Sequence, residues 1–216
     1  MTTDVLPTTA GDLPLEEVQL SIDGRTWSIL HTGALVTAEQ ELEFLRGETT
    51  VRRPYGIVLW PAAIALAHAL VGRPLAGVRI LELGAGTGLP GIVAASLGAR
   101  VVQTDRQQLV LHVCRLNAAR NGVTAIDCRA ADWTAWDDAE RYDLILAADC
   151  LYAEPLHPYL RRIFEGNLAP GGAVLLADPY RETSLRLLEA MEADGWRVAL
   201  DKWSAPRPVG VFTLTR

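Results

Sequence analysis

From residue 78 onward, short apolar runs alternate with segments of helical spacing, and this alternation constrains the fold more than any other feature of the sequence. The runs are brief and continuously apolar, as strands covered on both faces of a sheet are. Because a helix separates each run from the next, successive strands need crossover connections and run parallel. The fold class is therefore α/β. The predicted strands lie at residues 78–83, 100–104, 125–129, 143–148 and 173–177, and the predicted helices at residues 90–97, 107–121, 154–168 and 183–194.

The last part of the chain departs from this alternation. RVALDKW and VGVFTLT are two strand-like runs with only a proline-rich turn between them. Strands joined in this way pair antiparallel. Together with the earlier runs they predict a Rossmann-like, doubly wound, seven-stranded sheet, which is mostly parallel and has an antiparallel C-terminal strand pair.

The start of the chain predicts an extension of a different kind. Residues 1–14 are polar and rich in threonine, and we expect a mobile leader there. Two alternating runs flank Asp23-Gly24, which is a strong signal for a β-hairpin. Residues 38–47 have helical spacing that ends at a glycine. The predicted parts are an N-terminal leader, β-hairpin and helix over residues 1–50, and a main domain over residues 51–216.

Composition narrows the classes of function. Half of the 216 residues are hydrophobic, which is enough for a substantial core, and the formal net charge of -6 argues against a protein that coats nucleic acid. Three widely spaced cysteines form no CxxC pair, and four histidines form no HxH or HExxH pattern. No signal peptide or membrane-spanning run is visible. We therefore expect a monomeric, cytoplasmic protein with reduced cysteines and no metal, membrane or nucleic-acid partner. Lysine occurs once while arginine is frequent, which indicates a GC-rich bacterial genome.

The first strand of the main domain runs into the stretch ILELGAGTGLP. An acid, Glu82, stands before three glycines at alternate positions, Gly84, Gly86 and Gly88. In an open α/β sheet, ligands bind at the carboxyl ends of the strands, so this loop is the expected site. Glycines let backbone amides approach a ligand, and the next helix offers its N-terminus to negative charge. A pyrophosphate-binding loop would have the pattern GxGxxG, but Leu89 stands where its last glycine is needed.

The GxGxG form, preceded by an acid, resembles motif I of the class I, seven-β-strand S-adenosylmethionine-dependent methyltransferases. The methionyl end of that cofactor carries an ammonium, which Glu82 can help to hold directly or through water. Asp105 ends the next strand, where its carboxylate can accept both ribose hydroxyl hydrogens. In the later stretch AADWTAW, Asp132 could accept from the adenine amine, and Trp133 could face the ring with its amide and wall it with its indole. Two plainer roles stay open: Asp105 as a helix cap and Trp133 as a loop residue that closes the core.

The fourth strand is followed by an acid and a tyrosine three residues apart, Asp149 and Tyr152, in YDLILAADCLY. This spacing resembles the family 16 methyltransferases, many of which methylate lysine on specific proteins. The resemblance covers about residues 55–194. It includes GIVLWPAAIALA, and the longer run LGAGTGLPGIVAASLGARVVQTDR is very similar to the lysine methyltransferases of heat-shock chaperones. The stretch ADPYR is more similar to the lysine methyltransferases that act on the electron-transfer flavoprotein β-subunit. The cofactor residues that the resemblance implies are Trp60, Gly84, Ala85, Gly86, Asp105, Trp133 and Ala148.

Methyl transfer from a sulfonium to an amine is an in-line displacement, so positioning is most of the catalysis. A lysine ammonium, with an ordinary pKa of about 10.4, must lose a proton before it attacks. Asp149 can attract the ammonium and orient the amine, while the proton leaves to water, because a carboxylate is a poor base for an ammonium. Tyr152 can wall the channel and accept a hydrogen bond. The plainer reading makes Asp149 a helix cap and Tyr152 a packing residue.

Three other functions compete with methylation of a protein lysine. A small-molecule amine methyltransferase would share the cofactor site and differ in the shape of the acceptor cleft. Methyltransferases that act on nucleic-acid bases often carry an Asn/Asp-Pro-Pro-aromatic motif after the fourth strand, and the prolines are missing here. A nicotinamide-dependent oxidoreductase would need glycine in place of Leu89. We therefore expect S-adenosylmethionine as cofactor and a protein lysine as acceptor, with a small-molecule amine as the alternative.

Overall fold

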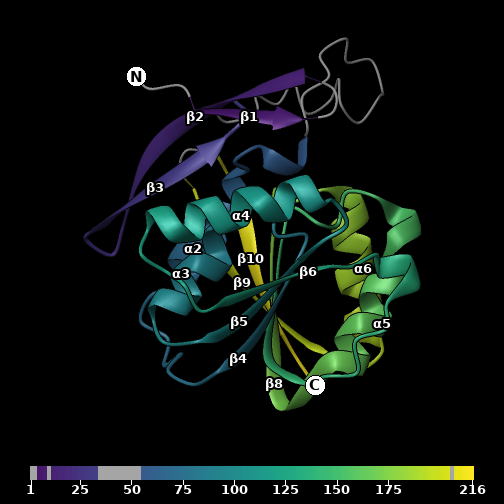
Figure 1. Ribbon diagram of the computed structural model, residues 1–216. Helices are drawn as coiled ribbons and strands as arrows, with labels where there is room; N and C mark the ends of the chain where they lie inside the picture. The colour runs from purple at the N-terminus through teal and green to yellow at the C-terminus, as the bar shows by residue number, and fades with distance from the viewer. Residues whose placement is uncertain (1–3, 9–10, 34–54, 205–206) are drawn as a thin grey trace.

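The computed structural model describes residues 4–8, 11–33, 55–204 and 207–216. Over these ranges the chain forms a sheet in the order β1-β2-β3 and a seven-stranded sheet in the order β6-β5-β4-β7-β8-β10-β9 (Figure 1). The strands are β1 (Asp4–Thr8), β2 (Gly11–Ile22), β3 (Arg25–His31), β4 (Arg79–Leu83), β5 (Arg100–Asp105), β6 (Ile126–Ala130), β7 (Tyr142–Ala148), β8 (Leu168–Asp178), β9 (Arg197–Trp203) and β10 (Val209–Thr215). The helices are α2 (Pro61–Leu70), α3 (Leu89–Ser96), α4 (Gln108–Arg120), α5 (His157–Asn167) and α6 (Glu182–Ala193), with 3₁₀ turns η1 (Tyr55–Ile57), η2 (Trp133–Ala135) and η3 (Glu154–Leu156).

The seven-stranded sheet confirms the predicted topology. Strands β4 to β8 pair in parallel, and β10 lies between β8 and β9 and runs antiparallel to both. The largest difference in bounds is at β8, which begins at Leu168 instead of residue 173. Pro170 and the glycines after it suggest a turn, yet Leu168 still pairs with Tyr142, and a register shift follows before regular pairing resumes.

Helices cover both faces of this sheet, because side chains on a strand alternate between the faces. Ile80 on β4 packs in a hydrophobic cluster with residues of α2 and α3, whereas the next residue, Leu81, packs with residues of α5 and α6. Figure 1 shows these two pairs of helices on opposite sides of the sheet. The carboxyl ends of the parallel strands therefore meet at one edge, where a ligand is expected. None of the helices in the described ranges is long and apolar enough to cross a membrane.

The prediction of a mobile leader is wrong for the described part of residues 1–14. Asp4–Thr8 form β1, which pairs antiparallel with the beginning of β2. Leu6 is buried against Leu15 and Leu30, while Val5 is exposed, which is the alternation of a half-buried strand. The abundance of polar residues concealed this alternation. The predicted helix at residues 38–47 lies outside the described residues.

The predicted hairpin is confirmed, and its sheet is anchored to α4. Asp23 and Gly24 both have positive φ angles, 54° and 69°, as a two-residue hairpin turn requires. Asn117 accepts from the Leu30 N–H at 2.7 Å and donates to the Leu30 carbonyl at 3.1 Å. Asn121, one helical turn further, makes the same pair of bonds to Ser28. Two amide side chains therefore take the place of a neighbouring strand along β3, which lies beside α4 in Figure 1.

The same anchor reaches the glycine loop. The Asn117 amide also donates to the Thr87 carbonyl at 2.9 Å, in the loop between β4 and α3. Asn117 is fully buried, so each of these bonds satisfies a backbone group that water does not reach. The N-terminal sheet is thus tied through one side chain to the loop that the sequence identifies as the ligand site.

Candidate active site

The glycine loop between β4 and α3 depends on the conformational freedom of its glycines. Gly84, Gly86 and Gly88 have φ angles of 61°, 58° and 80°. This left-handed region is open to glycine and costly for most other residues. Between them, the Ala85 N–H donates to the Thr104 carbonyl at 2.9 Å and holds the loop against β5. The loop is therefore a tight turn that presents backbone and few side chains at the carboxyl edge of the sheet.

Gly84 is the point at which the residues following three strands meet. A Cβ atom on Gly84 would lie 2.9 Å from Cys150 Sγ, after β7, and 3.2 Å from Trp133 Cζ2, after β6. Cys150 also donates its thiol hydrogen to the Leu83 carbonyl at 3.2 Å. The structure thus brings together the predicted loop, the predicted aromatic wall and the end of β7.

Asp105 is connected directly to the glycine loop. Its carboxylate accepts from the Gln107 N–H at 3.0 Å and also from the backbone N–H groups of Gly86 and Arg106. Burial raises the pKa of Asp105, and these backbone hydrogen bonds oppose the rise by favouring the charged form. Asp105 is not the cap of α4, because the N-cap is Gln107 and Asp105 binds the N–H of that residue rather than one within the helix. The contact with Gly86 places the Asp105 carboxylate beside the expected ligand.

Glu82 has its strongest contacts inside the protein, beneath the first turn of α3. Its carboxylate accepts from Gln103 Nε2 at 2.7 Å and from the Gly91 N–H. Gly91 has no room for a Cβ atom, which would overlap this carboxylate. Burial raises the pKa of Glu82 to about 7, although the bonds from Gln103 and Gly91 act in the opposite direction. The carboxylate thus supports the helix that follows the loop, and its contact with a cofactor ammonium stays a prediction.

The raised pKa of Glu82 predicts a pH dependence of stability. Relative to Glu82→Gln, the wild-type free energy of unfolding should fall as the pH rises from 4.5, the ordinary pKa, to about 7. In this window the folded protein holds a proton that the unfolded chain has lost, so the stabilisation is complete below the window and lost above it. The expected loss is on the order of 3 kcal/mol, since one pKa unit corresponds to about 1.4 kcal/mol.

Urea titrations at about pH 4 and about pH 8 measure this loss for the wild type and for Glu82→Gln. Glu16→Gln, which changes an exposed glutamate on β2, is the control and should keep the wild-type slope. Identical pH slopes for the wild type and Glu82→Gln would contradict the raised pKa.

Asp132 begins the 3₁₀ turn that carries Trp133. Its Oδ1 accepts from the Thr134 N–H at 2.8 Å and from Thr134 Oγ1 at 2.7 Å. These bonds lower the pKa of the exposed Asp132 carboxyl, which is therefore charged near neutral pH. Asp132 is thus a cap in this structure, and its predicted contact with an adenine amine is a role that it would need to fill in addition.

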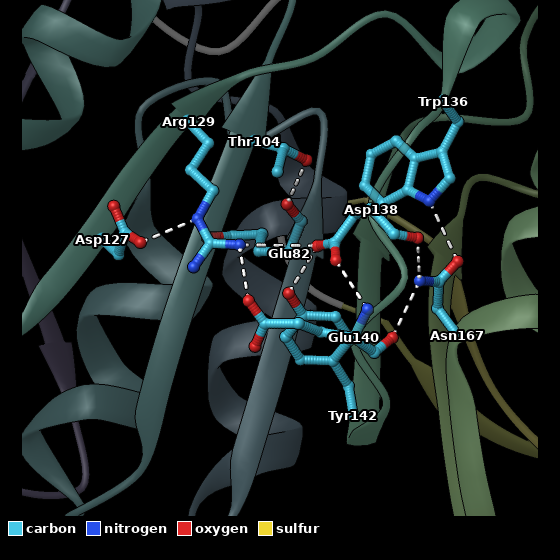
Figure 2. A network of polar contacts seen from close by, with 9 residues as sticks. All are labelled: Glu82, Thr104, Asp127, Arg129, Trp136, Asp138, Glu140, Tyr142 and Asn167. Carbon is cyan, nitrogen blue, oxygen red and sulfur yellow. Dashed lines mark hydrogen bonds and ion pairs between the residues drawn. The ribbon is translucent and has the colours of Figure 1, made fainter.

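A network of polar contacts, which the sequence does not predict, fixes the segment after Trp133. Trp136 Nε1 donates to Asn167 Oδ1 at 2.9 Å, and Asn167 Nδ2 donates to the Asp138 and Glu140 carbonyls at 2.8 and 2.9 Å (Figure 2). Asn167 is the last residue of α5 and is buried. Residues 136–140, which follow the turn that carries Trp133, are therefore held against α5.

Asp149 lies at the carboxyl end of β7 and forms an ion pair with Arg181, which follows the neighbouring strand β8. It is 8% exposed, and its N–H donates to the Ala177 carbonyl at 2.8 Å. Arg181 donates from Nη2 to Asp149 Oδ1 and from Nη1 to Asp178 Oδ2, the latter at 2.9 Å. Arg181 thus forms ion pairs with both Asp178 and Asp149, the residue predicted to face the acceptor.

Two residues at this edge of the sheet have a left-handed backbone conformation, which costs free energy for residues other than glycine. Asp149 has a φ angle of 58° and Tyr180 one of 65°, at the ends of the adjacent strands β7 and β8. Each such residue costs about 1 kcal/mol or more, and residues of this kind concentrate at functional sites. The strain therefore supports a function for the place where Asp149 lies.

Tyr152 follows β7 in the chain, three residues after Asp149. Its side chain is 41% exposed, and burial of the remainder raises the pKa of its hydroxyl. Asp105 and Asp149 both add to this rise, while Arg106 opposes it. Asp105, which is predicted to bind the ribose, and Asp149, which is predicted to face the acceptor, therefore both act electrostatically on Tyr152.

Ala148 and Trp60 are the other two residues for which a contact with the cofactor is predicted. Ala148 ends β7 beside Ala177 and precedes Asp149, so it lies at the edge of the sheet with the rest of the site. Trp60 is half-buried at the start of α2. The nearby Gly56 carbonyl would lie 3.4 Å from a Cβ atom on Gly86, so the segment before α2 touches the loop. The contact of Trp60 itself with a cofactor stays a prediction.

Comparison with known proteins identifies relatives of this chain. A family model described as lysine methyltransferase matches residues 39–193. The protein N-lysine methyltransferase METTL21A of Xenopus tropicalis is 37% identical over 131 residues, which are 57% of this chain and 60% of that protein. The histone-arginine methyltransferase METTL23 of Xenopus laevis is 35% identical over 106 residues, 45% of each chain. The chain thus spans about half the length of these curated relatives.

Solved structures share the fold. The 16S rRNA N2 G1207 methyltransferase RsmC of T. thermophilus, solved with AdoMet and guanosine, superposes with a TM-score of 0.62 at 19% identity. The superposition covers 94% of this chain and 50% of that one. It confirms the predicted fold class.

Proposed function

Because the chain belongs to the lysine methyltransferase family, we propose that it transfers a methyl group from S-adenosylmethionine to the amine of a lysine side chain in a protein. One observation carries the choice of acceptor. A buried carboxylate, Asp149, is held in a strained conformation at the carboxyl end of β7, next to the glycine loop. A carboxylate in this position suits an acceptor that arrives as a cation.

The residues at the loop fit the proposed cofactor better than they fit a dinucleotide. Gly84 has no room for a Cβ atom, Gly86 has a left-handed φ angle of 58°, and Asp105 lies beside them. Asp105 and Asp149 make the surroundings acidic, which opposes a diphosphate and favours a cation. When bound, S-adenosylmethionine supplies an electrophilic methyl group on a positively charged sulfur. Gly84, Ala85, Gly86, Asp105 and Trp133 are the residues that we propose to hold it.

The residues of the acceptor side would act mainly by position. Asp149 attracts the lysine ammonium and, once a proton has left to water, orients the amine for in-line attack. The proton does not pass to Asp149, because an ammonium with a pKa of about 10.4 is a far weaker acid than a carboxylic acid. Tyr152, on which Asp105 and Asp149 both act electrostatically, would form a wall of the acceptor channel.

The test of this function is transfer of a tritiated methyl group to the proteins of a cell lysate. Lys202 is the only lysine of the chain, so Lys202→Arg removes any signal from lysine methylation of the enzyme itself. After acid hydrolysis, chromatography separates methyl-lysine from methyl-arginine. We expect label in methyl-lysine of lysate proteins. Label confined to the small-molecule fraction would replace the proposal by a small-molecule amine methyltransferase, and label in nucleic acid alone would refute both.

We propose that residues 51–216 form the methyltransferase domain and that residues 1–50 extend it, with a boundary that falls outside the described residues. The monomeric state, the cytoplasmic location and the bacterial origin remain predictions, and the relatives reported above come from frogs. The described N-terminal sheet, through Asn117, supports the glycine loop.

A further inference from the structure

Gln103 is a buried amide beneath the glycine loop. It is 0% exposed and lies on β5, between the strands β4 and β6. Its Nε2 donates to the Gly88 carbonyl at 2.8 Å and to Glu82 Oε2 at 2.7 Å, and its Oε1 accepts from the Cys128 thiol at 3.7 Å. Both hydrogens of the amide nitrogen thus have an acceptor, and the oxygen has a donor. These contacts fix the direction in which the amide faces.

Strand β5 holds the glycine loop at two points. Side chains two residues apart on a strand point to the same face of the sheet, so Gln103 and Asp105 share a face. Asp105 accepts from the Gly86 N–H, and Gln103 donates to the Gly88 carbonyl. One face of β5 therefore supplies an acceptor for the middle of the loop and a donor for its end.

The end of the loop fits closely around the Gln103 amide. A Cβ atom on Gly88 would lie 3.0 Å from Gln103 Nε2, and one on Gly91 would lie 2.6 Å from it. The Gly88 carbonyl also accepts from the Ile92 N–H at 3.0 Å, which is the first hydrogen bond of α3. The position of the end of the loop and of the start of α3 relative to β5 thus depends on this amide.

Three successive carbonyls of the loop each accept a hydrogen bond from a side chain of the protein. The bonds run to Gly86 from Cys114 at 3.1 Å, to Thr87 from Asn117 at 2.9 Å and to Gly88 from Gln103 at 2.8 Å. Because the C=O and N–H of a trans peptide unit point in opposite directions, a bond to a carbonyl also sets the direction of the next N–H. The loop backbone therefore has a fixed orientation before a ligand arrives, and such preorganisation lowers the entropic cost of binding.

We propose that Gln103 is a positioning residue for the methyl donor, which fixes the end of the glycine loop through the Gly88 carbonyl. The proposal rests on the proposed function, since it takes the glycine loop as the part of the chain that binds S-adenosylmethionine. Gln103 is completely buried and acts on the cofactor through the loop backbone. The Glu82 carboxylate orients the amide for this role.

The test measures the binding of S-adenosylhomocysteine by calorimetry and stability by urea titration, for the wild type and for Gln103→Met at about pH 8. Methionine has nearly the length of glutamine and lacks its amide. Tyr142→Phe is the matched control, because it also removes a hydrogen bond from a neutral donor to a carboxylate, that of Asp138 at 2.6 Å. Tyr142 is the first residue of β7, at the end away from the glycine loop.

Glu82→Gln provides a second background in which Gln103→Met is measured. With glutamate at residue 82, Gln103→Met removes a donor from a buried carboxylate as well as from the Gly88 carbonyl, and the first of these losses lowers stability. With glutamine at residue 82 no such carboxylate is present, so the loss of stability is small and the variant stays folded. Comparing the two backgrounds therefore separates support of the loop from general destabilisation.

We expect Gln103→Met to weaken the binding of S-adenosylhomocysteine by about fivefold in both backgrounds, which corresponds to about 1 kcal/mol, as for one hydrogen bond. The urea midpoint should fall much further when residue 82 is glutamate than when it is glutamine. In the transfer assay, the KM for S-adenosylmethionine should rise by the same factor while kcat keeps its wild-type value. Tyr142→Phe should keep the wild-type affinity.

Two outcomes would overturn the proposal. The first is an unchanged affinity of Gln103→Met for S-adenosylhomocysteine. The second is an affinity loss that disappears together with the loss of stability in the Glu82→Gln background, which would show a merely structural role. Failure of the proposed function looks different, because the wild type itself then binds no S-adenosylhomocysteine.

Discussion

Asp149→Asn should bind S-adenosylmethionine with wild-type affinity and lose about 10²–10³-fold in kcat/KM, the loss typical of removing one oriented polar group from an active site. Asparagine tolerates the left-handed φ angle of 58° at this position and still accepts a hydrogen bond from Arg181. The substitution thus keeps the backbone and the shape while it removes the charge that attracts and orients the acceptor. The loss is expected in methyl transfer and not in the binding of the cofactor.

Two measurements separate these steps. Calorimetry gives the affinity for S-adenosylmethionine, and transfer of a tritiated methyl group gives the rate. Asp143→Asn is the matched control, because Asp143 lies on the same strand near its opposite end and pairs with Arg79 in a largely exposed ion pair. The control should keep both affinity and rate. Full activity of Asp149→Asn would remove Asp149 from the catalytic assignment.

Asp105→Ala should weaken the binding of S-adenosylmethionine by at least about 10²-fold. Two hydrogen bonds from ribose hydroxyl groups to a charged acceptor are each worth about 1.5–3 kcal/mol, and alanine removes both. The Gln107 N–H also loses its partner, and the loss of such a hydrogen bond costs about 1 kcal/mol of stability. Affinity and stability should therefore both fall, and affinity should fall further.

Asp105→Asn separates the two effects, because asparagine can still accept from the Gln107 N–H. Its stability should stay near that of the wild type, while its affinity should lie between those of the wild type and Asp105→Ala. Asp127→Asn, on the neighbouring strand β6 and paired there with Arg129, is the control for charge. Unchanged calorimetric affinity of Asp105→Ala would show that the cofactor does not use this residue.

The sequence predicts most of the large sheet because its signals are local. Short apolar runs, each followed by a helix, fix the parallel order, and the glycine spacing marks the loop after β4. Asp105 was predicted at the end of β5 for the same reason, since the end of a strand can be read from neighbouring residues. The left-handed φ angles of Gly84 and Gly86 agree with the close backbone approach that the pattern indicates.

Several contacts that hold this site together are not local in the sequence. Arg181 meets Asp149 across 32 residues of sequence, and Asn117 meets Leu30 across 87. Such pairs depend on how two strands or a strand and a helix come to lie side by side, which no short window of sequence contains. The contacts of Glu82 are of the same kind. Its carboxylate, for which the sequence predicts a cofactor ammonium as partner, binds Gln103 and Gly91, which lie further along the chain.

The first strand was missed for a different reason. Residues 1–14 are polar in composition, and this composition hides the alternation of exposed Val5 and buried Leu6. A strand at the edge of a small sheet needs only one or two buried side chains. The burial of Leu6 beside Leu15 and Ala85 depends on the main domain, which the leader sequence does not reveal.

The most direct test of the account is a crystal structure of the protein with S-adenosylhomocysteine, the product that remains after the methyl group has left. The account predicts that this product lies on the backbone of Gly84 and Gly86, with its ribose hydroxyl groups on Asp105 and its sulfur directed toward Asp149. A structure in which the product binds elsewhere, or in which side chains of the protein fill the space over Gly84, would contradict it.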